Sequence, residues 1–176
     1  MFGGGACRAT LIAAQNTGLW LDAMGFIPSY TAFLALTAVG ASRGWAQRAI
    51  VAMLLIAGLS DEIEGVFMWR IMGAMPGTPA QLHGLWWAVH VKFGLLAVGT
   101  TLIGLELIRA FKLWPMLFGL VIAVGGATAV YGFWILPNAM MMAGFTYAWF
   151  AILVTAIVAS FAAGVFVRRV GVKALR

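Results

Sequence analysis

Five long apolar segments alternate with short polar connections along the chain. The apolar segments cover Leu19–Val39, Ile50–Trp69, Trp86–Ile108, Leu113–Leu136 and Thr146–Val167. Each is close to the length of about 20 residues that a helix needs to cross a hydrocarbon core of about 30 Å. The pattern therefore predicts an all-α integral membrane helical bundle with about five transmembrane helices, built as a single domain over residues 1–176.

Composition strengthens this prediction and excludes a soluble module. Of the 176 residues, 64% are hydrophobic and 9% are charged, whereas soluble proteins carry roughly 25% charged residues. The connections are short, and two of them contain proline, which breaks helices. Because short connections force neighbouring helices to run antiparallel, we expect a compact bundle.

Basic residues fall mainly on one side of the predicted bundle. Arg43 and Arg48 follow the first segment, and Arg109 and Lys112 follow the third. The basic residues after the fifth segment are Arg168, Arg169, Lys173 and Arg176. The opposite side carries only Arg8 and Arg70. Positively charged loops stay in the cytoplasm, so we expect an outside amino terminus, a cytoplasmic carboxyl terminus and a multi-pass protein of the cell membrane, most simply a bacterial inner membrane. The net charge of +6 then reflects topology, and no nucleic-acid partner is expected.

Four of the residues least suited to lipid stand inside the apolar segments: Asp61, Glu62 and Glu64 in the second, and Lys92 in the third. Charges at bilayer depth are rare, usually face the protein interior and are default candidates for a functional site. Measuring depth from the tryptophans places Glu64 level with Lys92, whereas counting from the connecting loop pairs Asp61 with Lys92 and Glu64 with His90. Both pairings stay open, but a contact between Lys92 and a carboxylate is expected.

Helical geometry divides these polar residues into faces. At about 100° per residue, Asp61 and Glu64 share a face and Glu62 points away from Glu64, while Lys92 lies about 200° from His90. Other polar residues fall in the outer half of the bundle, which indicates a pocket reached from outside. The residues expected to bind its ligand are Asp61, Glu64, Lys92, His90, Asp22, Tyr30 and Trp86.

Three stretches carry a resemblance to known sequences: LDAMGFIPSYTAFLAL, LLIAGLSDEIEGVFMWRI and HVKFGLLAV. They resemble small bacterial membrane proteins of unassigned function, which have an acidic residue early in the first span, Asp-x-x-Glu in the second and Lys near the start of the third. The matching positions here are Asp22, then Asp61 and Glu64, then Lys92. The resemblance implies a helical bundle in which Asp61, Glu64 and Lys92 act as one unit.

Three functions fit these features. The leading hypothesis is a pocket that binds a hydrophobic small molecule or membrane lipid, with Asp61 and Glu64 as its polar floor and Lys92 as counter-charge. The alternative is an accessory subunit of a larger membrane complex, or a homo-oligomer, joined through surfaces of small residues. The third is an enzyme acting on a lipid or terpenoid, with Asp61 and Glu64 as catalytic acid and base, because burial favours a protonated carboxyl group.

A metal centre or other cofactor is not expected. The two histidines, His83 and His90, lie seven residues apart, which separates them by about 10 Å along one helix. That distance is too long for both to bind one zinc ion, and the spacings typical of zinc-binding helices are absent from the sequence.

Overall fold

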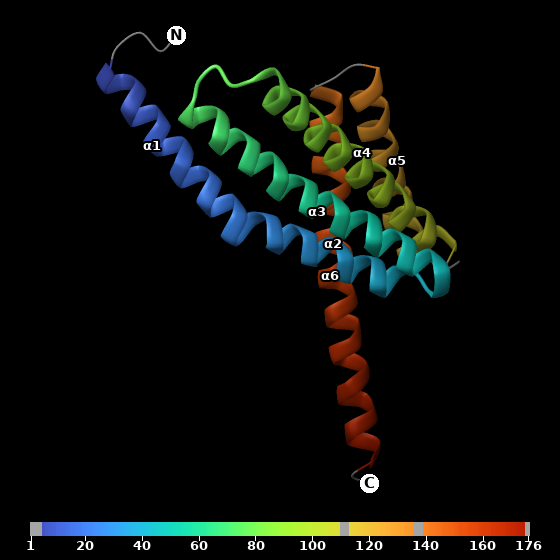
Figure 1. Ribbon diagram of the computed structural model, residues 1–176. Helices are drawn as coiled ribbons and strands as arrows, with labels where there is room; N and C mark the ends of the chain where they lie inside the picture. Colours follow the sequence, from blue (N-terminus) through green and yellow to red (C-terminus); the bar gives the residue numbers. More distant parts are fainter. Residues whose placement is uncertain (1–4, 110–112, 136–138, 175–176) are drawn as a thin grey trace. The chain divides into compact units, whose positions relative to one another are not determined.

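The computed structural model is all-helical over the residues that it describes (Figure 1). It describes the backbone of residues 5–109, 113–135 and 139–174, and the side chains of residues 9–109, 113–135 and 139–161. The elements in chain order are α1 (Gly5–Leu21), the π-helix η1 (Asp22–Phe26), α2 (Ile27–Ala41), α3 (Gly44–Gly73), α4 (Pro79–Arg109), α5 (Leu113–Trp134) and α6 (Ala139–Ala174). Because α1, η1 and α2 follow one another without a break, they form one long segment, which confirms the five helical segments expected from hydropathy.

The helices are mostly longer than the apolar segments that predict them. The first begins at Gly5 instead of Leu19, and the last begins at Ala139 instead of Thr146. Polar helical turns extend beyond the apolar stretch, and hydropathy alone does not detect them. Leu136, the expected end of the fourth segment, and the topology residues Lys112 and Arg176 lie outside the described residues.

Four helical segments are long and apolar enough to cross a membrane: Ala9–Ala41, Pro79–Arg109, Leu113–Trp134 and Ala139–Phe161. These are the segments of a multi-pass membrane protein. The helix α3, which contains the predicted segment Ile50–Trp69, is not among them. Its Asp61, Glu62 and Glu64 lie in one short stretch and lower its hydropathy.

The chain gathers into two compact units. The first comprises the residues up to Leu36 together with Arg48–Leu96, and the second comprises Thr37–Gln47 together with the residues from Ala97 onward. The first unit therefore holds α1, η1, most of α2 and α3, and the amino-terminal half of α4. Asp22, Asp61, Glu62, Glu64 and Lys92 all belong to this unit.

In the first unit, α2, α3 and α4 pack through one face each. The buried apolar residues of that core are Ile27, Tyr30, Leu34, Ile50, Leu54, Ala57, Ala88 and Leu96. On α2 and α3 they recur at intervals of three or four residues, and on α4 they lie eight residues apart, as expected for the inward face of a helix. Close approach of the helices is helped by Gly84 of α4, where a Cβ atom would overlap the ring of Phe67 on α3.

The connection between α3 and α4 ends at a capping motif at the amino terminus of α4. The Thr78 backbone N–H donates to Gln81 Oε1 over 2.8 Å, and the Gln81 N–H donates to Thr78 Oγ1 over 3.2 Å. This reciprocal arrangement is a capping box, and Pro79 occupies the first helical position, where no N–H is needed. The start of α4 is thereby set by local sequence.

In the second unit, glycines let α4, α5 and α6 approach one another closely. A Cβ atom on Gly104 of α4 would lie 2.8 Å from the Cα of Ala123 on α5. One on Gly125 of α5 would lie 2.8 Å from the carbonyl oxygen of Gly144 on α6. The small-residue surfaces of the last two segments are thus used for packing within the chain, as expected for helices in lipid.

Candidate functional site

A buried ion-pair cluster lies in the first unit, on α2, α3 and α4. The Lys92 ammonium lies 3.0 Å from Asp61 Oδ1 and also contacts Glu64 Oε2. Tyr30 donates a hydrogen bond from its hydroxyl group to Asp61 Oδ2 over 2.7 Å. The side chains of Lys92, Asp61 and Glu64 are only 10%, 17% and 15% exposed, so the cluster is largely buried.

This geometry resolves the two alternative pairings. Lys92 contacts both carboxylates, since Asp61 and Glu64 lie three residues apart and therefore share a face of α3. Both oxygens of Asp61 are engaged, one by Lys92 and the other by Tyr30. One ammonium group therefore holds two carboxylates, and α2, α3 and α4 are joined through polar contacts at this level.

The cluster continues the apolar core of the unit. On α3, Leu54 and Ala57 are fully buried, and Asp61 and Glu64 follow them at helical spacing on the same face. On α4, Lys92 lies between the buried Ala88 and Leu96, four residues from each. The packing that buries the apolar residues therefore also turns these charges inward, where unpaired they would be strongly disfavoured.

A glycine on α3 helps Tyr30 reach Asp61. A Cβ atom on Gly58, one turn before Asp61, would lie 2.9 Å from Thr31 Cγ2 on α2. Any larger residue at Gly58 would push α2 away from α3. The absence of a side chain therefore supports the short hydrogen bond between Tyr30 and Asp61.

The π-helix η1 ends at Phe26, two residues before Pro28, and forms a wider helical turn within the first segment. The Ile27 N–H bonds to the carbonyl oxygen of Asp22, five residues earlier. Pro28 has no N–H to offer to Met24, and its ring would clash with that carbonyl group in a regular α-helix. The first segment therefore accommodates Pro28 through a π-helical turn, and Figure 1 shows the chain axis bending between α1 and α2. Such turns occur frequently at functional sites.

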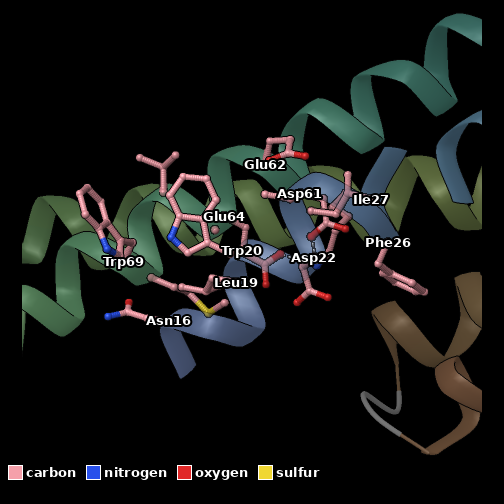
Figure 2. Close-up of a pocket in the computed structure, with 15 residues that line it drawn as sticks. Asn16, Leu19, Trp20, Asp22, Phe26, Ile27, Asp61, Glu62, Glu64 and Trp69 are labelled. Atoms are coloured by element: carbon pink, nitrogen blue, oxygen red, sulfur yellow. Dashed lines mark hydrogen bonds and ion pairs between the residues drawn. The ribbon is translucent and has the colours of Figure 1, made fainter. Parts of the chain in front are cut away.

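A cavity of about 470 Å³ opens beside the cluster. It lies between the α1–η1 segment and the carboxy-terminal half of α3, with Lys92 contributed by α4 (Figure 2). Apolar and aromatic side chains make most of its wall, among them Trp20, Phe26 and Trp69. Its charged lining residues are Asp22, Asp61, Glu62, Glu64 and Lys92. The cavity belongs entirely to the first unit.

Of the seven residues expected to bind a ligand, four line the cavity: Asp61, Glu64, Lys92 and Asp22. Tyr30 is not among the lining residues, but it donates a hydrogen bond to Asp61, which is one of them. Sequence reasoning also separated Glu62 from this group, but Glu62 contributes to the same wall. The cavity is wide enough to take lining residues from more than one face of α3. Helical angles show which residues face one neighbouring helix, so they do not predict a wall formed by two faces.

The other two expected residues, Trp86 and His90, are not among the residues that line the cavity. They belong to an aromatic cluster along α4. The His90 ring stacks on Trp86 at a centroid distance of 3.7 Å, and its Nδ1 lies 2.7 Å from the Trp86 carbonyl oxygen. In the same cluster Trp87 donates from Nε1 to His83 Nε2 over 3.0 Å. The angle of about 200° between Lys92 and His90 accounts for this separation.

The residues that sequence reasoning did not assign to the site come mainly from the first segment and from the carboxy-terminal turns of α3. They are Asn16, Leu19, Trp20, Ala23, Phe26, Ile27, Glu62, Gly65, Val66, Met68 and Trp69. Most are apolar, so nothing in their type distinguishes them from residues that face lipid. The acidic residues and Lys92 were the only chemical signal available.

The arrangement can bind an amphiphilic molecule or move a proton. Within the described part of the chain, no three His, Cys, Asp or Glu residues come together as metal ligands would. The cavity instead offers an apolar wall for a hydrocarbon body and carboxylates for a polar group. Its size falls in the range of about 300–1,000 Å³ that small-molecule pockets usually have.

Comparisons with known proteins give no further information on the function of this site. No protein-family model, curated protein or solved structure matches the chain significantly. The features of this chain that bear on its function are therefore the cavity and the charges that line it.

Proposed function

We propose that this protein binds a hydrophobic small molecule or lipid in the cavity of its first unit. The observation that carries the proposal is a cavity of about 470 Å³ whose mostly apolar wall ends at a buried charge cluster. Asp61 and Glu64 form the polar floor, and Lys92 neutralises part of their charge. Few but well-placed polar groups in an apolar pocket are typical of ligand sites, where they orient the molecule that the apolar wall binds.

The proposal places the cavity at the outer side of a bacterial inner membrane. We infer that α3 crosses the membrane together with the four more apolar segments, which puts the amino terminus outside and the carboxyl terminus in the cytoplasm. Arg43 and Arg48 near the α2–α3 connection support this orientation, because basic loops stay cytoplasmic. The contacts of Lys92 with Asp61 and Glu64 reduce the cost of carrying those carboxylates in α3.

Topology is tested with reporter fusions that are active on only one side of the membrane. A periplasmic reporter inserted at Gly77, between α3 and α4, is expected to be active, and the same reporter inserted at Arg43 is expected to be inactive. The opposite result would place the cavity on the cytoplasmic side and refute the outward-facing proposal.

Ligand binding is tested by filling the cavity without touching the charge cluster. Gly65 lines the cavity, and a Cβ atom there would meet no heavy atom within 4 Å. Gly65→Phe therefore projects a large side chain from the cavity wall without a clash at its first atom. Gly40→Phe is the matched control, since Gly40 also has open space at its Cβ position and does not line the cavity.

The measurement is native mass spectrometry of the purified protein together with extraction of its bound lipids. The wild type and Gly40→Phe are expected to retain a small molecule that Gly65→Phe loses. The double variant Asp61→Asn, Glu64→Gln is expected to lose it as well, because it removes the polar floor. If the same molecule accompanies all four proteins, the cavity is not its binding site. A wild type that carries a second protein subunit and no small molecule would favour the accessory-subunit hypothesis.

A further inference from the structure

The cavity is unbalanced in charge. Its wall carries four carboxylates, those of Asp22, Asp61, Glu62 and Glu64, and a single ammonium group, that of Lys92. Lys92 already contacts Asp61 and Glu64, so its charge is shared between two partners. In surroundings of low dielectric constant, a charge excess of this kind is costly unless a positive group joins it.

Two of the four carboxylates are not neutralised by the cluster. Neither Glu62 nor Asp22 takes part in an ion pair with any side chain that the structure describes. Asp22 lies on η1 and Glu62 on α3, so these carboxylates reach the cavity from two different elements. Negative charge therefore faces the cavity from both of its walls.

Aromatic side chains flank these carboxylates. In Figure 2 the carboxylates lie between Trp69 on α3 and Phe26 on η1, and Trp20 of α1 lines the same cavity. The faces of aromatic rings attract cations, tryptophan most strongly. They also supply apolar area for a hydrocarbon body. Carboxylates and aromatic faces together favour an organic cation over a neutral or anionic molecule of the same size.

Building on the proposed function, we propose that the ligand of this cavity is a lipophilic organic cation, a molecule with an apolar body and a positively charged head. The head lies among Asp22, Glu62 and Glu64, and the body lies against Trp20, Phe26 and Trp69. Lys92 does not recruit an anionic headgroup, because its ammonium is already held by Asp61 and Glu64 and an anion there would meet four carboxylates.

The test compares two probes of matching shape and opposite charge, tetraphenylphosphonium and tetraphenylborate. Equilibrium binding of each is measured on the full-length protein in nanodiscs of a zwitterionic lipid, with empty nanodiscs subtracted. We expect the wild type to bind the phosphonium at least tenfold more tightly than the borate. Equal or tighter binding of the borate would overturn the inference.

Two single variants test the carboxylates without breaking the ion-pair cluster. Glu62→Gln and Asp22→Asn each remove one charge that Lys92 does not hold, so both are expected to fold. Each is expected to weaken phosphonium binding about three- to tenfold and to leave borate binding unchanged or tighter. Glu106→Gln is the matched control, because it removes a carboxylate paired with Arg109 on α4, outside the cavity. Unchanged phosphonium affinity in both single variants would overturn the inference.

The cavity-filling variant separates failure of the charge inference from failure of the proposed function. One outcome is that the wild type binds the phosphonium no better than the borate, while Gly65→Phe abolishes binding of the borate or retention of a neutral native molecule. The cavity is then a ligand site without cation selectivity. If neither probe binds and no native molecule depends on Gly65, both proposals are wrong.

Discussion

Replacing Lys92 by methionine removes the only positive charge of the buried cluster and keeps a side chain of similar length. Asp61 Oδ1, now 3.0 Å from the Lys92 ammonium, and Glu64 Oε2 would both lose their counter-charge. Breaking a buried ion pair by removing one partner costs about 3–5 kcal/mol, because a buried charge is left uncompensated. We expect a loss near the lower end, about 3 kcal/mol, since the carboxylates face a cavity and Asp61 keeps its hydrogen bond from Tyr30.

For a chain of this size, about 3 kcal/mol corresponds to a fall in Tm of roughly 6–12 °C. The assay is thermal unfolding of the purified protein in detergent, followed by tryptophan fluorescence. Arg109→Met is the control, because the Arg109 side chain is 71% exposed in its ion pair with Glu106, and a pair with an exposed partner contributes little. Its Tm should stay within about 2 °C of that of the wild type.

A rescue variant separates loss of charge balance from loss of packing. Adding Asp61→Asn and Glu64→Gln to Lys92→Met removes the uncompensated charges, and most of the lost Tm should return. If Lys92→Met unfolds within about 2 °C of the wild type, or if the triple variant is no more stable than Lys92→Met alone, the cluster does not hold the helices through charge.

Three further predictions use the same unfolding assay. Tyr30→Phe removes the 2.7 Å hydrogen bond to Asp61 and should cost about 1.5–3 kcal/mol, as expected for a bond to a charged group; an unchanged Tm would show that Asp61 does not need it. Gly104→Val should cost at least about 2 kcal/mol or prevent folding, because its Cβ would lie 2.7 Å from the Gly119 carbonyl oxygen on α5. Gly18→Ala should raise the stability by up to about 1 kcal/mol, because Gly18 is helical with open space at its Cβ position, and a clear loss would contradict this geometry.

Much of the site was within reach of sequence reasoning because its central residues are chemically conspicuous. Asp61, Glu64 and Lys92 stand out in apolar segments, and helical spacing places the two carboxylates on one face. The two estimates of depth along the helices paired Lys92 with different carboxylates. They could not decide between Asp61 and Glu64, since a lysine side chain is long enough to reach both. The structure shows contacts with both.

Other parts of the site were beyond sequence reasoning for a physical reason. Leu19, Val66 and Met68 line the cavity but are no different in type from residues that face lipid. Trp86 and His90 lie near Lys92 in sequence, yet they turn to a separate aromatic cluster. Which side chains face a cavity depends on the rotation and bending of whole helices, and helix rotation is set by packing.

Hydropathy and spacing along the chain were sufficient for the helical class, for the positions of the five segments and for the pairing of Lys92 with carboxylates. These features follow from local rules: the length of an apolar run, the pitch of a helix and the cost of an unpaired charge in a medium of low dielectric constant. The cavity, the Tyr30–Asp61 hydrogen bond and the place of Glu62 in the cavity wall depended on tertiary structure. They arise from the π-helical turn before Pro28 and the close contact at Gly58, where one helix sets the position of another.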